Sequence, residues 1–223
     1  IENGLFRESH RGNMLIASTW RHREEMKRIG RGNADRRWDV LPQQPALAYD
    51  LAQNRLIVTA AMLQAPVLDM SRDAAAHYGS FGALVGHELS HVVDAKGRLV
   101  DAAGNLRDWW TPGETTAWDT LGQRVAAQYG AYDYPGLTGI KLNGQQTREG
   151  NIADIAGVEL AWDAYNHAND AATKEAKQAF FQGWAQLWAQ QLSPEAASAL
   201  AASSVHAPGQ WRVNGAVQNL PAF

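Results

Sequence analysis

The chain has 223 residues, a formal net charge of −3 and no cysteine. Disulfides are therefore excluded, and any metal site must be built from histidine and carboxylate ligands. The small negative charge gives no support to nucleic acid as a partner. No apolar run reaches the roughly 18 residues that a membrane-spanning helix needs, so no membrane span is expected.

The front of the chain predicts one helix, a loop and a β-hairpin. Residues 15–30 have helical spacing and stop at a glycine. Residues 31–45 are rich in Gly, Asn, Asp and Pro, which is typical of a loop. Alternating and β-branched residues at 46–50 and 55–63 predict two strands joined by a short turn.

The remainder is predicted to be mainly helical. A helix is expected over 70–95 after a Ser71 cap, and a Thr111-Pro112 pair predicts the start of another. Residues 205–223 are expected to be irregular. The other predicted helices are 150–169, with Ile152, Ile155, Ala156 and Leu160 on one face, then 172–192, and 194–203 after Ser193. The fold class is therefore α+β and mostly α, and the alternative organisation is two subdomains divided near residue 70.

The stretch VGHELSHVVD, residues 85–94, places two histidines four residues apart. On a helix these residues share a face, so the imidazoles of His87 and His91 can bind one ion. Glu88 lies about 100° round the helix from His87 and can act as general base on a metal-activated water. The alternative is a helix with two structural or surface histidines. The apolar stretch FGALV before the motif favours the metal, because buried histidines need partners.

A catalytic zinc site also needs a third protein ligand, commonly a carboxylate, and an acid that accepts the other N–H of a ligating histidine. The predicted helix near residue 150 carries Glu149, Asp154, Glu159 and Asp163. Asp154 has apolar neighbours, which makes it the candidate orienting acid, although a partly exposed helix acid is the alternative. Glu159 and Asp163 are expected to face solvent.

The segments GHELSHVVDAKGR, DWWT, LNG, NIADIAG and VHAPGQWRVNG occur in the order and spacing of the neprilysin-like zinc metallopeptidases. Earlier segments also match, among them WRHREEMKRIG, DRRW, QQPALAYD and NRLIVTAAMLQAPVLD. The chain thus resembles the C-terminal, thermolysin-like catalytic lobe of this family over nearly all of its length. Residues 1–223 would then be one catalytic lobe of a longer chain, without the N-terminal helical lobe and the extreme C-terminus.

This resemblance implies Zn²⁺ as cofactor, a peptide as substrate and an extracytoplasmic location, either periplasmic or secreted. It also implies a capping N-terminal lobe as partner, from the same protein or from another chain. Because that lobe would cover an apolar face, association with it or with a second copy is expected.

The resemblance also assigns roles residue by residue. His87 and His91 match the zinc ligands, Glu88 the general base and Asp154 the acid that orients a zinc histidine. His206 matches the histidine that stabilises the oxyanion.

Two further matches concern the substrate. Arg212 matches the arginine that binds a substrate carbonyl, and Ala48 matches the edge-strand residue whose backbone pairs with the substrate. From the residues alone, His206 in its Pro/Gly loop is typical of an exposed histidine, and Arg212 beside Trp211 is typical of a stacking pair.

Three positions depart from the family pattern. Leu47 replaces the asparagine before Ala48, which removes an amide that would hold the substrate. Ser204 replaces the acid that lies two residues before His206, so His206 should be less readily protonated. Gly150 stands where the third zinc ligand directly precedes NIAD.

Glycine cannot bind metal, and the neighbouring Glu149 lies about 100° away round the helix. Backbone freedom at Gly150 favours a swing of Glu149 into the site, so Glu149 is the expected third ligand. Without it, the site has two histidines plus waters and binds zinc weakly. The predicted function is a zinc-dependent endopeptidase or oligopeptidase that cuts on the amino side of bulky apolar residues. The alternative is a catalytically impaired member that acts as a peptide-binding or partner-associated subunit.

Overall fold

The computed structural model describes residues 5–30, 40–169 and 173–223. The chain divides into two compact units, residues 1–39 and 40–223, so the boundary does not lie near residue 70. None of the helices within the described residues is long and apolar enough to cross a membrane.

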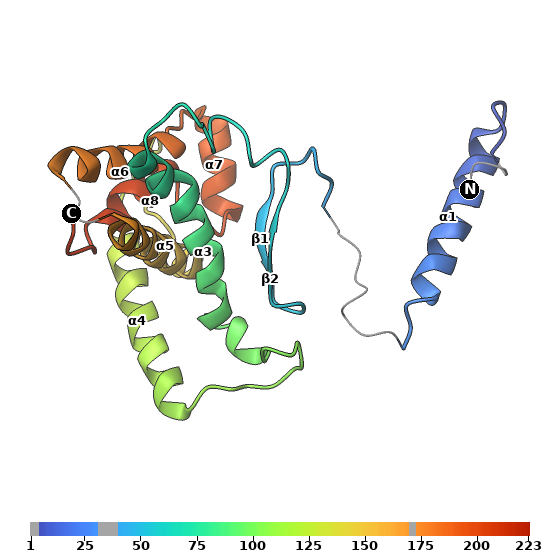
Figure 1. Cartoon of the computed structure of the whole chain (residues 1–223), viewed down its shortest axis with the longest axis horizontal. Coiled ribbons are helices and arrows are strands. Elements are labelled where there is room, and N and C mark those ends of the chain that lie inside the picture. The colour runs from blue at the N-terminus through green and yellow to red at the C-terminus, as the bar shows by residue number, and fades with distance from the viewer. Residues whose placement is uncertain (1–4, 31–39, 170–172) are drawn as a thin grey trace. The chain divides into compact units, whose positions relative to one another are not determined.

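The first unit contains helix α1, which spans His10–Met26 (Figure 1). It begins after Ser9, whose side chain accepts the backbone N–H of Gly12. The helix expected over 15–30 therefore starts and stops earlier than its spacing predicted. The segment DRRW and most of the predicted loop lie outside the described residues.

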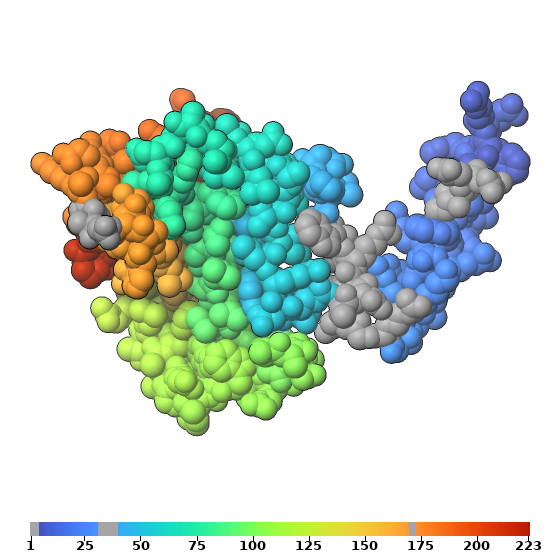
Figure 2. All heavy atoms as spheres, viewed as in Figure 1, coloured from blue at the N-terminus to red at the C-terminus, as the bar shows by residue number. Residues whose placement is uncertain are grey.

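The second unit opens with the predicted hairpin. Strand β1 (Leu47–Asp50) pairs antiparallel with β2 (Arg55–Val58), and Ala48 lies opposite Ile57. Asn54, in the turn, has a φ of 48°, a left-handed conformation that asparagine tolerates. The hairpin lies directly beside helix α3 (Ala83–Ser90), as Figures 1 and 2 show.

Residues 70–95 form a broken series of short helices and not one continuous helix. Helix α2 (Ala74–His77) is followed by a π-helical turn over Tyr78–Gly82, by α3, and by a 3-10 turn over His91–Val93. The backbone stays in the right-handed helical region through His91, with φ −65° and ψ −14°. The helical spacing of the two histidines is therefore kept even though α3 ends between them.

The start of this series corrects the cap predicted at Ser71. The side chain of Asp73 accepts the N–H of Ala76 and caps α2. Ser71 instead donates its hydroxyl to the carboxylate of Asp69 in the preceding turn. Aspartate and serine are equally good caps, so the sequence offered two starts and the structure uses the second.

Most of the remaining described residues are helical, which confirms the predicted fold class. Thr111 caps α4 with a pair of bonds: its hydroxyl accepts the backbone N–H of Glu114, and the Glu114 carboxylate accepts the backbone N–H of Thr111. Ser193 caps α7. The tail predicted to be irregular contains a helix, which was missed because Pro208 at its start offers no side-chain cap. These helices are α4 (Pro112–Gly130), α5 (Arg148–Ala168), α6 (Lys174–Leu187), α7 (Pro194–Ser203) and α8 (Gly209–Val217).

Helix α5 forms the centre of the second unit, because it contributes to both apolar clusters. One cluster includes Val158, Phe180 and Trp184, and the other includes Ile152 and Tyr129. The predicted apolar face was partly wrong, because Leu160 is 50% exposed. Neighbouring helices cover α5 on more than one side, so its buried residues extend beyond one narrow stripe. The predicted exposure of Glu159 and Asp163 is confirmed.

Helices α3 and α5 meet at two glycines. A Cβ added at Gly86 would lie 2.7 Å from the carbonyl oxygen of Gly157, and one added at Gly157 would lie 2.5 Å from the backbone nitrogen of His87. The two backbones therefore touch where any side chain would separate them. This close approach brings His87 of α3 beside Asp154 of α5.

Candidate metal centre

The histidine motif of α3 forms a group that suits a metal ion. One ligand atom from each of His87, Glu88 and His91 lies within 4.8 Å of the others. The ring centroids of the two histidines are 5.1 Å apart. Two imidazoles on one tetrahedral zinc, with Zn–N bonds of about 2.1 Å, have centroids at about this separation. The two rings are therefore already arranged for one ion.

His87 is buried and is held by a carboxylate from α5. Its Nδ1 lies 2.7 Å from Oδ1 of Asp154, and Arg212 donates to the same carboxylate through Nε at 2.7 Å and Nη2 at 2.5 Å. Burial alone would raise the pKa of Asp154, but the Arg212 guanidinium and the His87 contact hold that pKa below its usual range. Asp154 thus stays ionised and accepts the Nδ1 proton, which leaves Nε2 of His87 to face the ion.

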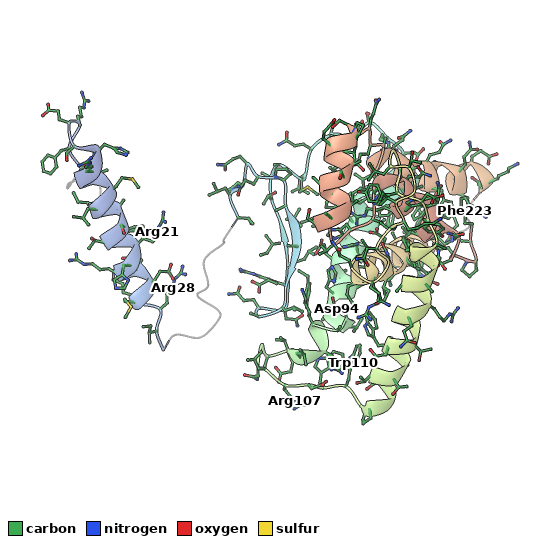
Figure 3. All side chains as sticks on the ribbon, turned by 180° about the vertical axis from the view of Figure 1, so that it is seen from behind. Arg21, Arg28, Asp94, Arg107, Trp110 and Phe223 are labelled. Atoms are coloured by element: carbon green, nitrogen blue, oxygen red, sulfur yellow. The ribbon has the colours of Figure 1, made fainter. Side chains whose placement is uncertain are left out.

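His91 is held in the same way by Asp94, a residue that the sequence analysis missed. Its Nδ1 lies 2.8 Å from Oδ2 of Asp94, whose other oxygen accepts the backbone N–H groups of Lys96 and Gly97. The contact with Asp94 raises the pKa of His91. Figure 3 labels Asp94 beyond the end of α3. The signal was an acid three residues after the second histidine, in HVVD.

Glu88 points toward the hairpin. Its Oε2 accepts the backbone N–H of Tyr49 at 3.1 Å, and this bond links strand β1 to helix α3. Thr59 donates its backbone N–H to the carbonyl of Ala46. Hydrogen-bonded and non-bonded pairs alternate along antiparallel strands. The backbone N–H and C=O of Ala48 therefore point toward Ile57 of the partner strand. The outward edge of the strand is formed by the backbones of Leu47 and Tyr49.

Gly150 lies buried beside His206 at the start of α5. A Cβ at this position would lie 2.8 Å from Cδ2 of His206 and 3.2 Å from the carbonyl oxygen of Val205. The imidazole thus lies where a longer side chain at position 150 would begin. The ring centroids of His206 and His87 are 6.0 Å apart.

Ser204 contacts the backbone of His206 and not its ring. It donates its hydroxyl to the carbonyl of His206 and accepts the N–H of the same residue. Partial desolvation of the ring and the nearby Arg212 lower the pKa of His206. The direction agrees with the reduced protonation expected from the serine at position 204.

Glu149 has one engaged and one unengaged oxygen. Its Oε1 accepts Nε of Arg148 at 2.9 Å and Nη2 at 2.6 Å. Its Oε2 is buried, and within the described residues it has no hydrogen-bond partner. Glu149 does not join the close group of metal-binding atoms formed by the histidine motif. Its charge nevertheless contributes to the raised pKa of His91, after Asp94.

Arg212 stacks on Trp188 and not on Trp211. Its guanidinium lies 3.5 Å from the Trp188 ring centroid, whereas Trp211 stacks on Tyr132 with centroids 4.0 Å apart. The ring of Trp188 and the carboxylate of Asp154 therefore fix the guanidinium from two directions.

Two cavities contain residues of the site or its immediate neighbours. One of about 300 Å³ is lined by His206, Arg212 and Trp188. The other, of about 310 Å³, is lined mainly by apolar groups, including Tyr49 from β1 and Val92 next to His91.

The residues present fit a zinc ion. Two imidazoles have engaged Nδ1 atoms, and among the described residues the buried Oε2 of Glu149 has no hydrogen-bond partner. Histidine nitrogen and carboxylate oxygen are the ligands that catalytic zinc takes when cysteine is absent.

Comparisons with known proteins agree with this geometry. The family model for peptidase family M13 matches residues 48–223. Neprilysin-3 of Drosophila melanogaster is 28% identical over 221 residues, covering 95% of this chain and 28% of that protein. Human endothelin-converting enzyme 1 is 32% identical over 195 residues, covering 83% of this chain and 25% of that protein.

Solved structures give the same result. The zinc metalloprotease ZMP1 of Mycobacterium tuberculosis, in complex with an inhibitor, has a TM-score of 0.81 and 32% identity, covering 91% of this chain and 32% of that one. PEPO of Lactobacillus rhamnosis has a TM-score of 0.76 and 38% identity, covering 83% of this chain and 29% of that one. The chain thus spans a quarter to a third of the length of these relatives.

Proposed function

The chain belongs to peptidase family M13, and from this premise we propose that it hydrolyses peptide bonds in a zinc-dependent reaction. The observation that carries the proposal is the group formed by His87, Glu88 and His91, whose ligand atoms lie within 4.8 Å of one another. A pair of histidines and a carboxylate at this spacing provides two metal ligands and a base for one water molecule.

The two histidines would hold the ion through Nε2, and Glu149 would supply the third protein ligand. Zn²⁺, when bound, polarises a substrate carbonyl and makes a water molecule more acidic. The buried Oε2 of Glu149, which lacks a partner among the described residues, supports its assignment. Asp154 and Asp94 orient the two imidazoles, so the ligands do not have to be ordered when the ion arrives.

Glu88 acts as general base and takes a proton from the attacking water. The N–H of Tyr49 holds one of its oxygens, which fixes the direction of the carboxylate. Glu88 later returns the proton to the leaving amine, as general acid–base catalysis requires. His206 stabilises the oxyanion as a neutral imidazole that donates an N–H, in keeping with its lowered pKa.

The substrate binds beside β1 and between the two cavities. Because Ala48 faces Ile57, the role predicted for Ala48 passes to the outward backbone of Leu47, which pairs with the peptide by β-augmentation. Arg212, fixed by Asp154 and Trp188, binds a substrate carbonyl. The side chain that follows the cleaved bond enters the cavity lined by Trp188 and Arg212.

The test is metal content together with peptide hydrolysis. The purified protein is stripped with a chelator, reloaded with zinc, and assayed with a quenched fluorogenic peptide that carries bulky apolar residues. One zinc per chain and zinc-dependent cleavage are expected. Glu88→Gln should keep its zinc and lose about 10²- to 10⁴-fold in turnover, since it removes only the base. Zinc well below one per chain after loading would contradict the proposal.

The second candidate function is a catalytically impaired family member that binds peptides or a partner without cutting them. Gly150 favours it, because a glycine stands where the family pattern has a metal ligand. In that case the fluorogenic peptide binds, as measured by fluorescence anisotropy, but stays intact at any zinc concentration. Cleavage that follows the zinc titration would exclude this candidate.

The location and partner are further parts of the proposal. The protein acts outside the cytoplasm. A second lobe covers exposed apolar side chains at the end of α3 and after it, among them Leu89, Val92, Val93 and Leu106. Light scattering at rising protein concentration should therefore detect self-association when no such lobe is present. A monomer at high concentration would count against this covered face.

A further inference from the structure

We propose that Arg148 is a positioning residue for the third metal ligand. It holds Oε1 of Glu149 so that the other oxygen, Oε2, remains available to the ion. The inference rests on the proposed function and names one more residue of the same site.

The first observation is the unequal state of the two Glu149 oxygens. Both hydrogen bonds from Arg148 go to Oε1, while the buried Oε2 has no partner within the described residues. A buried carboxylate oxygen without a hydrogen bond is unfavourable unless a cation or donor completes it. The ion expected at the neighbouring histidines is such a cation.

The second observation is the geometry of the grip on Oε1. Arg148 directs both Nε and Nη2 at Oε1, so the guanidinium occupies that oxygen and fixes its place. The single ammonium group of a lysine offers a compact point charge in place of this planar pair of donors. In the family pattern the ligand stands at position 150, and a side chain at position 149 leaves the helix in another direction. The side chain of Glu149 therefore needs another residue to position it.

The third observation is the space in which Arg148 lies. A Cβ added at Gly122, on α4, would lie 2.9 Å from Cδ of Arg148. The stem of the arginine therefore crosses α4 where α4 has no side chain. Gly122 on α4 thus leaves room for the stem of Arg148, whose guanidinium holds the neighbouring Glu149 on α5.

A plain ion pair between neighbouring, half-buried residues is the simpler alternative. Such pairs change stability little and leave metal binding unaffected. An outer group that orients a metal ligand behaves differently, because its loss typically reduces metal affinity about 10- to 100-fold. Metal affinity therefore separates the two readings, and folding stability does not.

The experiment measures zinc affinity by competition with a chromophoric chelator, and the visible absorption of the cobalt-loaded protein. Arg148→Met keeps the apolar stem and removes the grip, and it should weaken zinc binding about 10- to 100-fold and change the cobalt spectrum. Arg148→Lys should give an intermediate loss. Gly122→Ala keeps every charge but crowds Arg148, and it should weaken binding less than Arg148→Met.

The matched control is Arg124→Met, an exposed arginine of α4 that undergoes the same change of residue and charge. It should bind zinc like the unsubstituted protein. Equal affinity in Arg148→Met and the control would overturn the inference, and so would tighter binding in Arg148→Met, because Arg148 would then hold Glu149 away from the ion. An unsubstituted protein that binds no zinc would overturn the proposed function itself, which is a separate result.

Discussion

Helix α3 and the 3-10 turn that follows it supply two histidines whose Nδ1 atoms are each held by an aspartate, whereas the first turn of α5 supplies a glycine and a glutamate bonded to an arginine. The α3 side is fixed by a buried contact from Asp154 and a partly buried one from Asp94. The α5 side depends on a half-buried pair, Arg148 and Glu149. The two sides thus differ in burial: the His87 contact lies in the core, whereas the Glu149 contact lies partly in solvent.

The largest expected effect comes from breaking the α3 side at Asp154. Asp154→Ala leaves the guanidinium of Arg212 buried without its carboxylate and should lower the free energy of unfolding by about 3–5 kcal/mol. The measurement is the urea midpoint of the metal-free protein. The control is Asp163→Ala, which changes an exposed acid on the same helix. It should change the free energy of unfolding by less than about 0.5 kcal/mol. Equal midpoints for the two variants would mean that the Asp154 network adds no stability.

The next effect tests the α5 side. Glu149→Gln should weaken zinc binding on the order of a hundredfold, at the upper end of what outer groups contribute, since it removes a ligand and not a support. Adding Gly150→Glu to this variant should restore binding, provided the flexible ring of His206 moves out of the way. Gly150→Glu alone should change little. A gain of orders of magnitude from that single change would instead identify the natural chain as the impaired form.

A smaller effect is expected at Asp94. Asp94→Asn keeps an oxygen for the backbone N–H groups of Lys96 and Gly97 but presents an N–H to His91, so it disturbs the histidine alone. Zinc affinity should fall about 10- to 100-fold with little change in the unfolding midpoint. Asp108→Asn, at an exposed position, serves as control. An unchanged affinity would show that the second histidine needs no acid.

The smallest effect is a pH dependence of the metal-free protein. The pKa of Asp154 in the folded state is lowered, so its contribution to stability is complete above its unfolded pKa of about 3.9. That contribution is lost as the pH falls through the folded pKa. Thermal unfolding should therefore show a loss of stability below about pH 4 that is reduced in Asp154→Ala. Identical slopes for both proteins would assign the acid sensitivity to other groups.

The sequence predicted those parts of the fold that carry local signals. The cap and proline pairs at Thr111 and Ser193 marked the starts of α4 and α7. Helix α8 was missed because Pro208 at its start has no capping side chain, and its stability depends on packing against α4 and α5. The cap of α2 was placed at Ser71 because two good caps lie within three residues of each other.

The site was predictable where four-residue spacing on a helix defined it. Asp94 was missed because an acid three residues after a histidine is common, and the structure gives it meaning through the backbone donors of Lys96 and Gly97. The residue that pairs with the substrate stays a prediction, because a sequence does not show which backbone groups of a strand bond its partner strand. The bond from Tyr49 to Glu88 reveals which residues face outward.

The contact between Gly86 and Gly157 has a consequence for how this site can vary. The His87–Asp154 contact depends on the close approach of α3 and α5, which is possible because neither Gly86 nor Gly157 has a Cβ. An alanine at either glycine would push α3 and α5 apart, and the histidine would lose its alignment although every ligand is still present. A substitution at either glycine would therefore disturb the site, although neither residue offers a ligand or a base.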